Sequence, residues 1–131
     1  MAIIADHKNN FFAQLNEEYF GQRHIFLTGH KDGKVLIWRS DMFIGVLADY
    51  KDEVTCMTKC FEGIAIATSR GFIHVWDNYL MKVLKVIELA SLPFKILSYS
   101  ICGIDYNQKR LLVLTLGGDA IEIELGSTTS L

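Results

Sequence analysis

Apolar and polar residues follow one another along the chain in short blocks, and turns containing glycine separate the blocks at regular intervals. Three stretches share one plan, in which an apolar run, a tight turn and a second apolar run follow each other. They read "HIFLTGHKDGKVLIW" (24–38), "GIAIATSRGFIHVW" (63–76) and "RLLVLTLGGDAIEI" (110–123). Short runs rich in β-branched and aromatic residues predict strands, and a brief turn with glycine between two such runs predicts a hairpin.

Each hairpin is flanked by two further runs with strand composition. One run follows the hairpin, as in "MFIGVLA" after Arg39 and "LMKVLKVIELA" after Tyr79, and one precedes it, beginning at Phe11, Val54 or Phe94. The stretch "NNFFAQLNEEYF" also fits helical spacing, but the repeat favours a strand there. The chain therefore predicts three repeats of four strands, with approximate bounds 7–48, 50–89 and 94–125. We match three sets of positions in the hairpins: Thr28, Thr68 and Thr115; Gly33, Gly71 and Gly118; Trp38, Trp76 and Ile123.

A phosphate-binding loop is an alternative for "FLTGHKDGKVLIW", and its spacing excludes that interpretation. A P-loop needs four residues between its glycines and a Ser or Thr directly after the lysine. Here three residues separate Gly29 from Gly33, and Val35 follows Lys34. The hydroxyl that would hold magnesium is missing, so we interpret the stretch as a hairpin.

Composition narrows the class of protein. The 131 residues are 50% hydrophobic and 21% charged, with a net charge of −2 and no basic block, which argues against nucleic acid as a partner. The first ten residues lack a signal-peptide core, and no apolar run is long enough to span a bilayer, so we expect a cytoplasmic protein without membrane insertion. Three cysteines, an odd number, fit reduced thiols; Cys56 and Cys60 fit core or surface positions better than a zinc site.

The repeat resembles the WD40 repeat, whose blades have about 40 to 45 residues in four strands. "DHKNNFFAQL" is similar to the family's "GH" loop, with His7 in the histidine position, and Trp76-Asp77 gives the literal "WD". In the second repeat Tyr50 stands near the histidine position and Arg70 replaces the turn aspartate. The resemblance implies an all-β fold of about three four-stranded antiparallel propeller blades forming an incomplete ring. It also implies a structural hydrogen-bond chain inside the blades, with these members: His7, Thr28, Asp32, Trp38, Thr68 and Trp76.

The last repeat resembles a subfamily. "LLVLTLGGDAIEIEL" is similar to the atypical blade of the echinoderm microtubule-associated protein-like family, although that family's N-terminal coiled coil and hydrophobic motif are absent. The resemblance implies a non-catalytic platform for protein partners, with tubulin or microtubules as the partner and a cytoskeletal location. The alternative is a generic WD40 scaffold segment in a multiprotein complex without a cytoskeletal role. Candidate partner-binding loop residues are Lys8, Asn10, Lys31, Tyr50 and Lys51.

No arrangement of residues predicts catalysis, a cofactor or a metal site. The serines lack a nucleophile elbow, and the four histidines lie in different predicted elements without ligand spacing. We therefore expect a protein that is not an enzyme. Since a closed propeller needs at least four blades, three repeats predict part of a larger propeller protein, with open blade faces through which the isolated chain self-associates.

Overall fold

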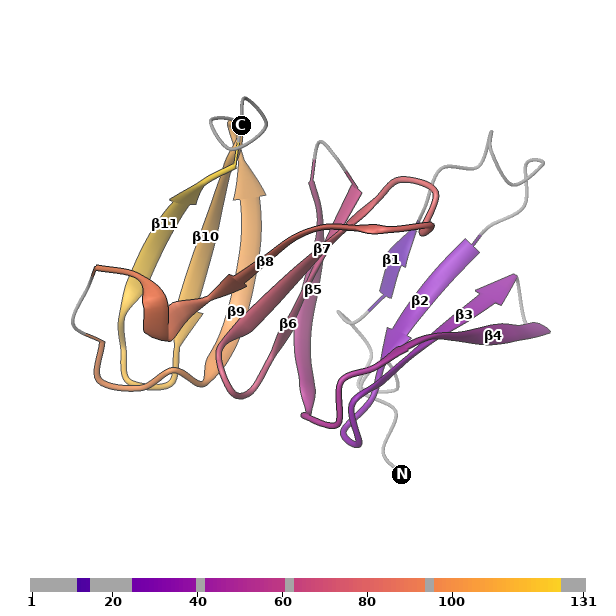
Figure 1. The fold of residues 1–131 in the computed structure, drawn as a ribbon, viewed down its shortest axis with the longest axis horizontal. Coiled ribbons are helices and arrows are strands. Elements are labelled where there is room, and N and C mark those ends of the chain that lie inside the picture. The colour runs from indigo at the N-terminus through magenta and orange to yellow at the C-terminus, as the bar shows by residue number, and fades with distance from the viewer. Residues whose placement is uncertain (1–11, 15–24, 40–41, 61–62, 94–95, 126–131) are drawn as a thin grey trace.

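The computed structural model describes residues 12–14, 25–39, 42–60, 63–93 and 96–125, and nearly all of its regular structure is β-strand. These residues contain eleven strands and one short 3₁₀ helix, whose arrangement can be followed in Figure 1. Their bounds are β1 Phe12–Gln14, β2 Ile25–Gly29, β3 Lys34–Arg39, β4 Met42–Asp49, β5 Val54–Cys60, β6 Gly63–Thr68, β7 Phe72–Asp77, β8 Val83–Glu88, η2 Leu89–Ser91, β9 Ile101–Asn107, β10 Arg110–Thr115 and β11 Ala120–Glu124.

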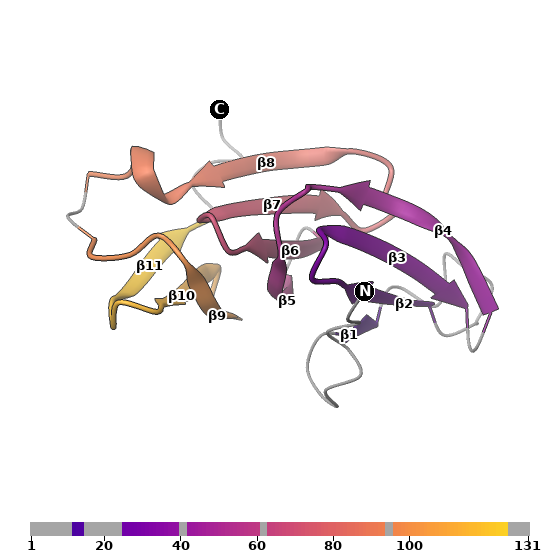
Figure 2. The ribbon, with the colours of Figure 1, turned by 90° about the horizontal axis from the view of Figure 1, so that it is seen from below.

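The strands form three antiparallel sheets, each a simple meander. The first sheet is β1-β2-β3-β4, the middle sheet is β5-β6-β7-β8 and the third sheet is β9-β10-β11. The sheets follow one another in chain order (Figure 1), with β5 and β9 on the inner side of the arc and β4 and β8 on the outer side (Figure 2). The predicted all-β class with about three antiparallel blades is confirmed.

Two details differ from the expected pattern. The third sheet has three strands within the described residues, not four. Its first strand begins at Ile101, whereas we expected the run from Phe94 to form it; the residues from 96 to 100 are extended or bent without ladder pairing. The run at Phe11 does contain a strand, β1, which pairs with β2 and extends over Phe12–Gln14.

Two hydrophobic cores lie on the two faces of the middle sheet. The core toward the first sheet contains Leu27 and Val35 from that sheet and Val54, Met57, Ile64 and Ile66 from the middle sheet. The core toward the third sheet contains, among others, Cys56, Ala65, Ala67, Ile73, Ile101, Leu111 and Val113. The middle sheet is therefore buried on both faces, as a propeller blade is.

Strand β6 shows why its sequence is apolar at every position. Successive side chains of a strand point to opposite faces, so Ile64 and Ile66 enter one core while Ala65 and Ala67 enter the other. All six residues of β6 are buried. Full burial of one isoleucine contributes about 1.5 to 3 kcal/mol, so both neighbouring sheets stabilise this strand.

The three hairpin turns have the same backbone geometry. In each turn the glycine N–H donates to the carbonyl three residues earlier, at His30, Thr68 or Thr115, over 3.1 Å. The matches among the glycines and among Trp38, Trp76 and Ile123 therefore hold, since each closing residue lies five positions after its glycine. The match of Thr28 with Thr68 was wrong, because His30 occupies the turn position equivalent to Thr68.

The outer strands β4 and β8 expose apolar side chains and carry β-bulges. Register shifts leave Ile44 and Leu47 in β4 and Leu84 in β8 between paired residues of the ladder. Met42, Phe43 and Val46 are among the exposed residues of β4. Because a bulge twists the strand and interrupts its hydrogen-bonding edge, it hinders direct edge-to-edge pairing with another molecule.

The turn glycine Gly33 gives a first prediction. Its φ is +102°, and a Cβ there would lie 2.5 Å from the Lys51 backbone nitrogen. We expect Gly33→Ala to lower the free energy of unfolding by about 1 to 3 kcal/mol, because strain and crowding act together. Gly45→Ala is the control, since no atom lies within 4 Å of its added Cβ. Urea unfolding followed by circular dichroism measures both; equal stability of the two variants would contradict the prediction.

Candidate functional site

Five loops lie in a row along one edge of the three sheets, at the bottom in Figure 1. We call this row the loop edge; it comprises residues 30–33, 49–54, 68–71, 97–100 and 115–119. Backbone hydrogen bonds connect neighbouring loops: Tyr50 N–H donates to the Gly33 carbonyl, Ser69 N–H to Glu53 and Leu116 N–H to Ser100, each over 2.9 Å. Main-chain bonds therefore join the first three loops to one another and the last two loops to each other.

In the first sheet the Thr28 hydroxyl joins a tryptophan and a histidine. The Trp38 indole Nε1–H donates to Thr28 Oγ1 over 2.9 Å, and the same oxygen lies 2.9 Å from His30 Nε2. Thr28 and His30 are buried. One hydroxyl carries a donor and two acceptor sites, so Thr28 satisfies both rings at once.

The histidine in this hydrogen-bonded set is His30, which sequence reasoning missed. We had placed His7 in that position; His7 lies outside the described residues. The available signal was the alternation of side chains along an extended strand. His30 directly follows β2 and is two residues from Thr28, so the two side chains share a face. Of the other expected members, Asp32 lies in the turn and binds Lys34 instead of Thr28, Trp38 or His30.

In the middle sheet a tyrosine receives the tryptophan hydrogen bond. The Trp76 indole Nε1–H donates to the Tyr50 hydroxyl over 2.8 Å. Thr68, expected in the same chain, is buried and forms no hydrogen bond with Trp76. Burial raises the pKa of Tyr50, and the bond from Trp76 opposes that shift only in part. Tyr50 is half-buried, so it is not the freely exposed loop residue that we expected.

Tyr50 also stacks on His74, which continues the aromatic row to Phe72. The ring centroids of Tyr50 and His74 are 3.9 Å apart with planes 11° from parallel, and those of Phe72 and His74 are 6.2 Å apart. Burial lowers the pKa of His74, and the nearby Asp52 carboxylate only partly opposes this. His74 is therefore a neutral aromatic ring at neutral pH.

Asp52 ties the loop between the first two sheets to the hairpin turn of the middle sheet. Its carboxylate accepts the Ser69 hydroxyl over 2.6 Å and the Arg70 backbone N–H over 2.9 Å. Burial acts to raise the pKa of Asp52, but the hydrogen bonds from the Ser69 hydroxyl and the Arg70 backbone, together with the Arg70 charge, outweigh it and lower the pKa.

A pocket of about 210 Å³ opens at this point of the loop edge. Its lining comes from the loop before β5, the β6–β7 turn and strand β7, and consists of Tyr50, Asp52, Thr68, Arg70, Phe72 and His74. The Arg70 side chain at the pocket is 77% exposed, whereas that of Asp52 is 12% exposed. Half of the lining residues are thus aromatic, and the more accessible charge is the Arg70 guanidinium.

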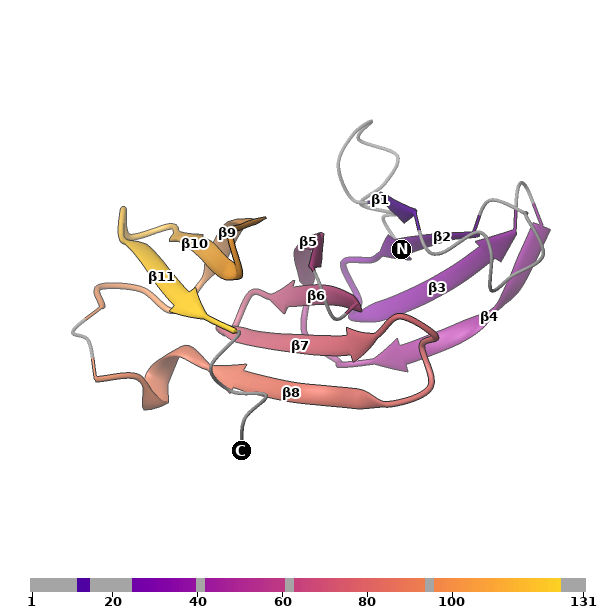
Figure 3. The same cartoon turned by 90° about the horizontal axis from the view of Figure 1, so that it is seen from above.

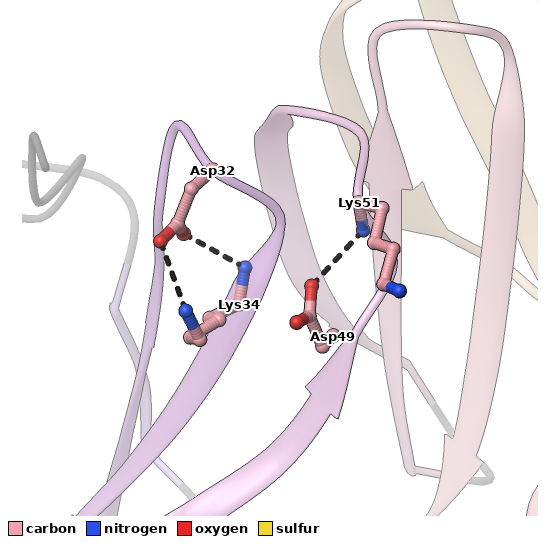
Figure 4. A network of polar contacts seen from close by, with 4 residues as sticks. All are labelled: Asp32, Lys34, Asp49 and Lys51. Carbon is pink, nitrogen blue, oxygen red and sulfur yellow. Dashed lines mark hydrogen bonds and ion pairs between the residues drawn. The ribbon is translucent and has the colours of Figure 1, made fainter.

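Two aspartates of the loop edge hold its turns (Figure 4). Asp32 accepts the Lys34 backbone N–H over 3.1 Å and the Lys34 ammonium over 3.3 Å. The backbone bond from Lys34 lowers the pKa of Asp32; burial opposes this, and the Lys34 side chain adds to the lowering. Asp49 accepts the Lys51 backbone N–H over 3.1 Å. Lys31 and Lys51, both candidate partner-binding residues, are exposed, while Lys8 and Asn10 lie outside the described residues.

The described residues contain little that suggests other chemistry. No group of three or more His, Cys, Asp or Glu side chains among them is placed to hold a metal ion. Cys56 and Cys60 are buried in the core, and burial raises the pKa of the Cys56 thiol to about 11. Across the ranges that the structure describes, no helix has the length and apolarity needed to cross a membrane.

Comparison with known proteins bears on the fold alone. No protein-family model matches the chain, and no curated protein matches it significantly in sequence. Solved structures do. Saccharomyces cerevisiae Sqt1 matches with a TM-score of 0.65 at 12% identity, over 87% of this chain and 32% of Sqt1. This chain has the fold of a β-propeller segment.

Two other structures extend the comparison. BBS1N, solved in complex with ARL6DN, matches with a TM-score of 0.62 at 13% identity, over 87% of this chain and 34% of BBS1N. The computationally designed protein Ika4 matches with a TM-score of 0.58 at 18% identity, over 78% of this chain and 61% of Ika4. The segment therefore spans about a third of Sqt1 and of BBS1N.

The shared hydroxyl of Thr28 gives a second prediction. We expect Thr28→Val to lower the free energy of unfolding by about 1 to 3 kcal/mol, because the Trp38 indole and the His30 ring lose a buried partner. Thr28→Ser retains the hydroxyl and should lose less. Thr58→Val is the matched control, since the Thr58 hydroxyl makes only an exposed bond to the Lys59 carbonyl. Urea unfolding measures all three; equal losses for Thr28→Val and Thr58→Val would contradict the assigned role.

Proposed function

We propose that the chain is part of a β-propeller that serves as a non-catalytic platform for protein partners, which bind at the loop edge. The observation that carries the proposal is that the backbone of these loops bonds within the chain while several of their side chains face solvent. Main-chain hydrogen bonds join the first three loops to one another and the last two to each other. The exposed side chains include basic and apolar ones: Lys31, Lys51, Arg70, Leu97, Tyr99 and Leu116. Binding residues on loops held by a rigid scaffold are typical of recognition surfaces.

A solved structure with this fold supports a protein as the partner, since BBS1N was solved with ARL6DN. For the identity of the partner we propose tubulin or microtubules, with a cytoplasmic and cytoskeletal location. The support is the resemblance of "LLVLTLGGDAIEIEL" (111–125) to the echinoderm microtubule-associated protein-like family. A generic scaffold role without tubulin is the second candidate, and the net charge of −2 favours it because acidic tubulin tails attract basic proteins.

Photo-crosslinking tests the platform. A benzoylphenylalanine replaces Lys51 on the loop edge or, as the control, Gln108, which is exposed in the turn at the opposite end of β10. We expect discrete protein adducts in cell extract from position 51 and not from position 108. Adducts from both positions alike, or from neither, would contradict the proposal. Pelleting of the chain with taxol-stabilised microtubules at low salt separates the two partners; without pelleting, the tubulin proposal fails and the scaffold role remains.

The exposed apolar residues of β4 and β8 support our proposal that the isolated chain self-associates. They include Met42 and Val46 on β4 and Val83 and Val86 on β8. Since the bulges hinder edge pairing, we expect association through side chains. Light scattering should report a mass above that of the 14.9 kDa chain, which decreases on dilution and in the Met42→Lys, Val46→Lys double variant. A monodisperse monomer at high concentration would contradict this.

A further inference from the structure

We propose that the pocket between Tyr50 and Phe72 accepts an acidic side chain of the partner protein, whose carboxylate binds the Arg70 guanidinium. This inference rests on the proposed platform function and gives its partner a chemistry. Tyr50, Phe72 and His74 give the pocket three aromatic rings, and Arg70 carries the charge at the pocket that solvent can reach most readily.

Four carboxylates on the loop edge already accept hydrogen bonds within the chain. Asp32, Asp49, Asp52 and Asp119 each accept a backbone N–H from their own or a neighbouring loop: from Lys34, Lys51, Arg70 and Leu97, respectively. Asp52, within the pocket, also accepts the Ser69 hydroxyl and is nearly buried. Each of its two oxygens thus already accepts a hydrogen bond within the chain, which leaves less acceptor capacity for a cation from a partner.

Arg70 is the cation that lines the pocket. The Arg70 guanidinium makes one ion pair among the described residues, in which Nε lies 3.9 Å from Asp52 Oδ1, the long limit of such a contact. The Arg70 side chain is largely exposed. Arginine binds carboxylates in a planar, bidentate arrangement, so its donors match an aspartate or glutamate side chain.

Aromatic side chains line the pocket beside Arg70. Phe72 and the Tyr50–His74 pair provide aromatic surface beside the guanidinium, and Tyr99 lies next to Gly71 in the adjoining loop. Lys51 and Lys31 are exposed further along the same loops. This combination fits a peptide in which an acidic residue is flanked by apolar residues.

NMR titration of the full chain tests the proposal with three peptides, acetyl-Gly-Leu-X-Leu-Gly-amide, in which X is glutamate, glutamine or lysine. The reporter is the indole N–H of Trp76, which is bonded to pocket residue Tyr50. We expect the glutamate peptide to bind with a Kd of about 1 mM and the glutamine peptide about fivefold to tenfold more weakly. In Arg70→Met this difference should disappear, while Arg39→Met, which removes an exposed arginine from the far end of β3, should retain it.

Four results would overturn the proposal: equal binding of the glutamate and glutamine peptides, tighter binding of the lysine peptide, an unchanged preference in Arg70→Met, or binding of no peptide up to about 10 mM. Each leaves the platform function testable by the position-51 crosslink. Adducts at that position together with any of these results would reject the acidic occupant alone. Absence of the adducts would reject the platform on which this inference depends.

Discussion

Burial of the middle sheet on both of its faces is the constraint on which the rest of this structure depends. Strand β6 has no solvent face, and its alternate side chains enter two different cores, so neither core forms without the adjacent sheet. An isolated four-stranded sheet of this composition would expose Ile64 and Ile66 to water on one face. On the other face it would expose Ile73 and Val75. The sequential order of the sheets follows, because the shortest connections place each sheet beside the one before it.

Once the sheets are packed face to face, their connecting loops must meet along one edge, and polar groups there need partners. The structure satisfies them mainly within the chain. Backbone N–H groups bond to carbonyls of the neighbouring loop, and carboxylates such as Asp52 and Asp119 bond to N–H groups across loops. The aspartates are therefore occupied by the fold, whereas Lys31, Lys51 and Arg70 project from it. The same edge carries five carboxylates, so the three cations are separate positive groups and the edge as a whole has no net positive charge.

The sequence predicted the sheets far better than the polar sites, for a physical reason. Hydrophobic periodicity and turn glycines report local geometry, so the hairpins and the equivalence of Trp38, Trp76 and Ile123 could be obtained from spacing. The partner of a tryptophan is a tertiary feature. The Trp38 indole donates to Thr28, which is also bonded to His30. The Trp76 indole instead donates to Tyr50, from the loop before its sheet. The repeat pattern does not predict this difference. The pocket likewise needs residues from three segments, which only the packing brings together.

The two kinds of surface left by this fold have different physical requirements. An apolar sheet face is covered only by a second surface of matching area and shape. The first and third sheets each have one face that points away from the middle sheet. A further sheet of the same kind meets that requirement, and Sqt1 and BBS1N, about three times as long as the matched segment, have room for such sheets. The loop edge differs, because its loops are hydrogen-bonded through the backbone and Lys51 and Arg70 are exposed. Neither side chain belongs to a core, so we expect both positions to tolerate substitution without loss of the fold.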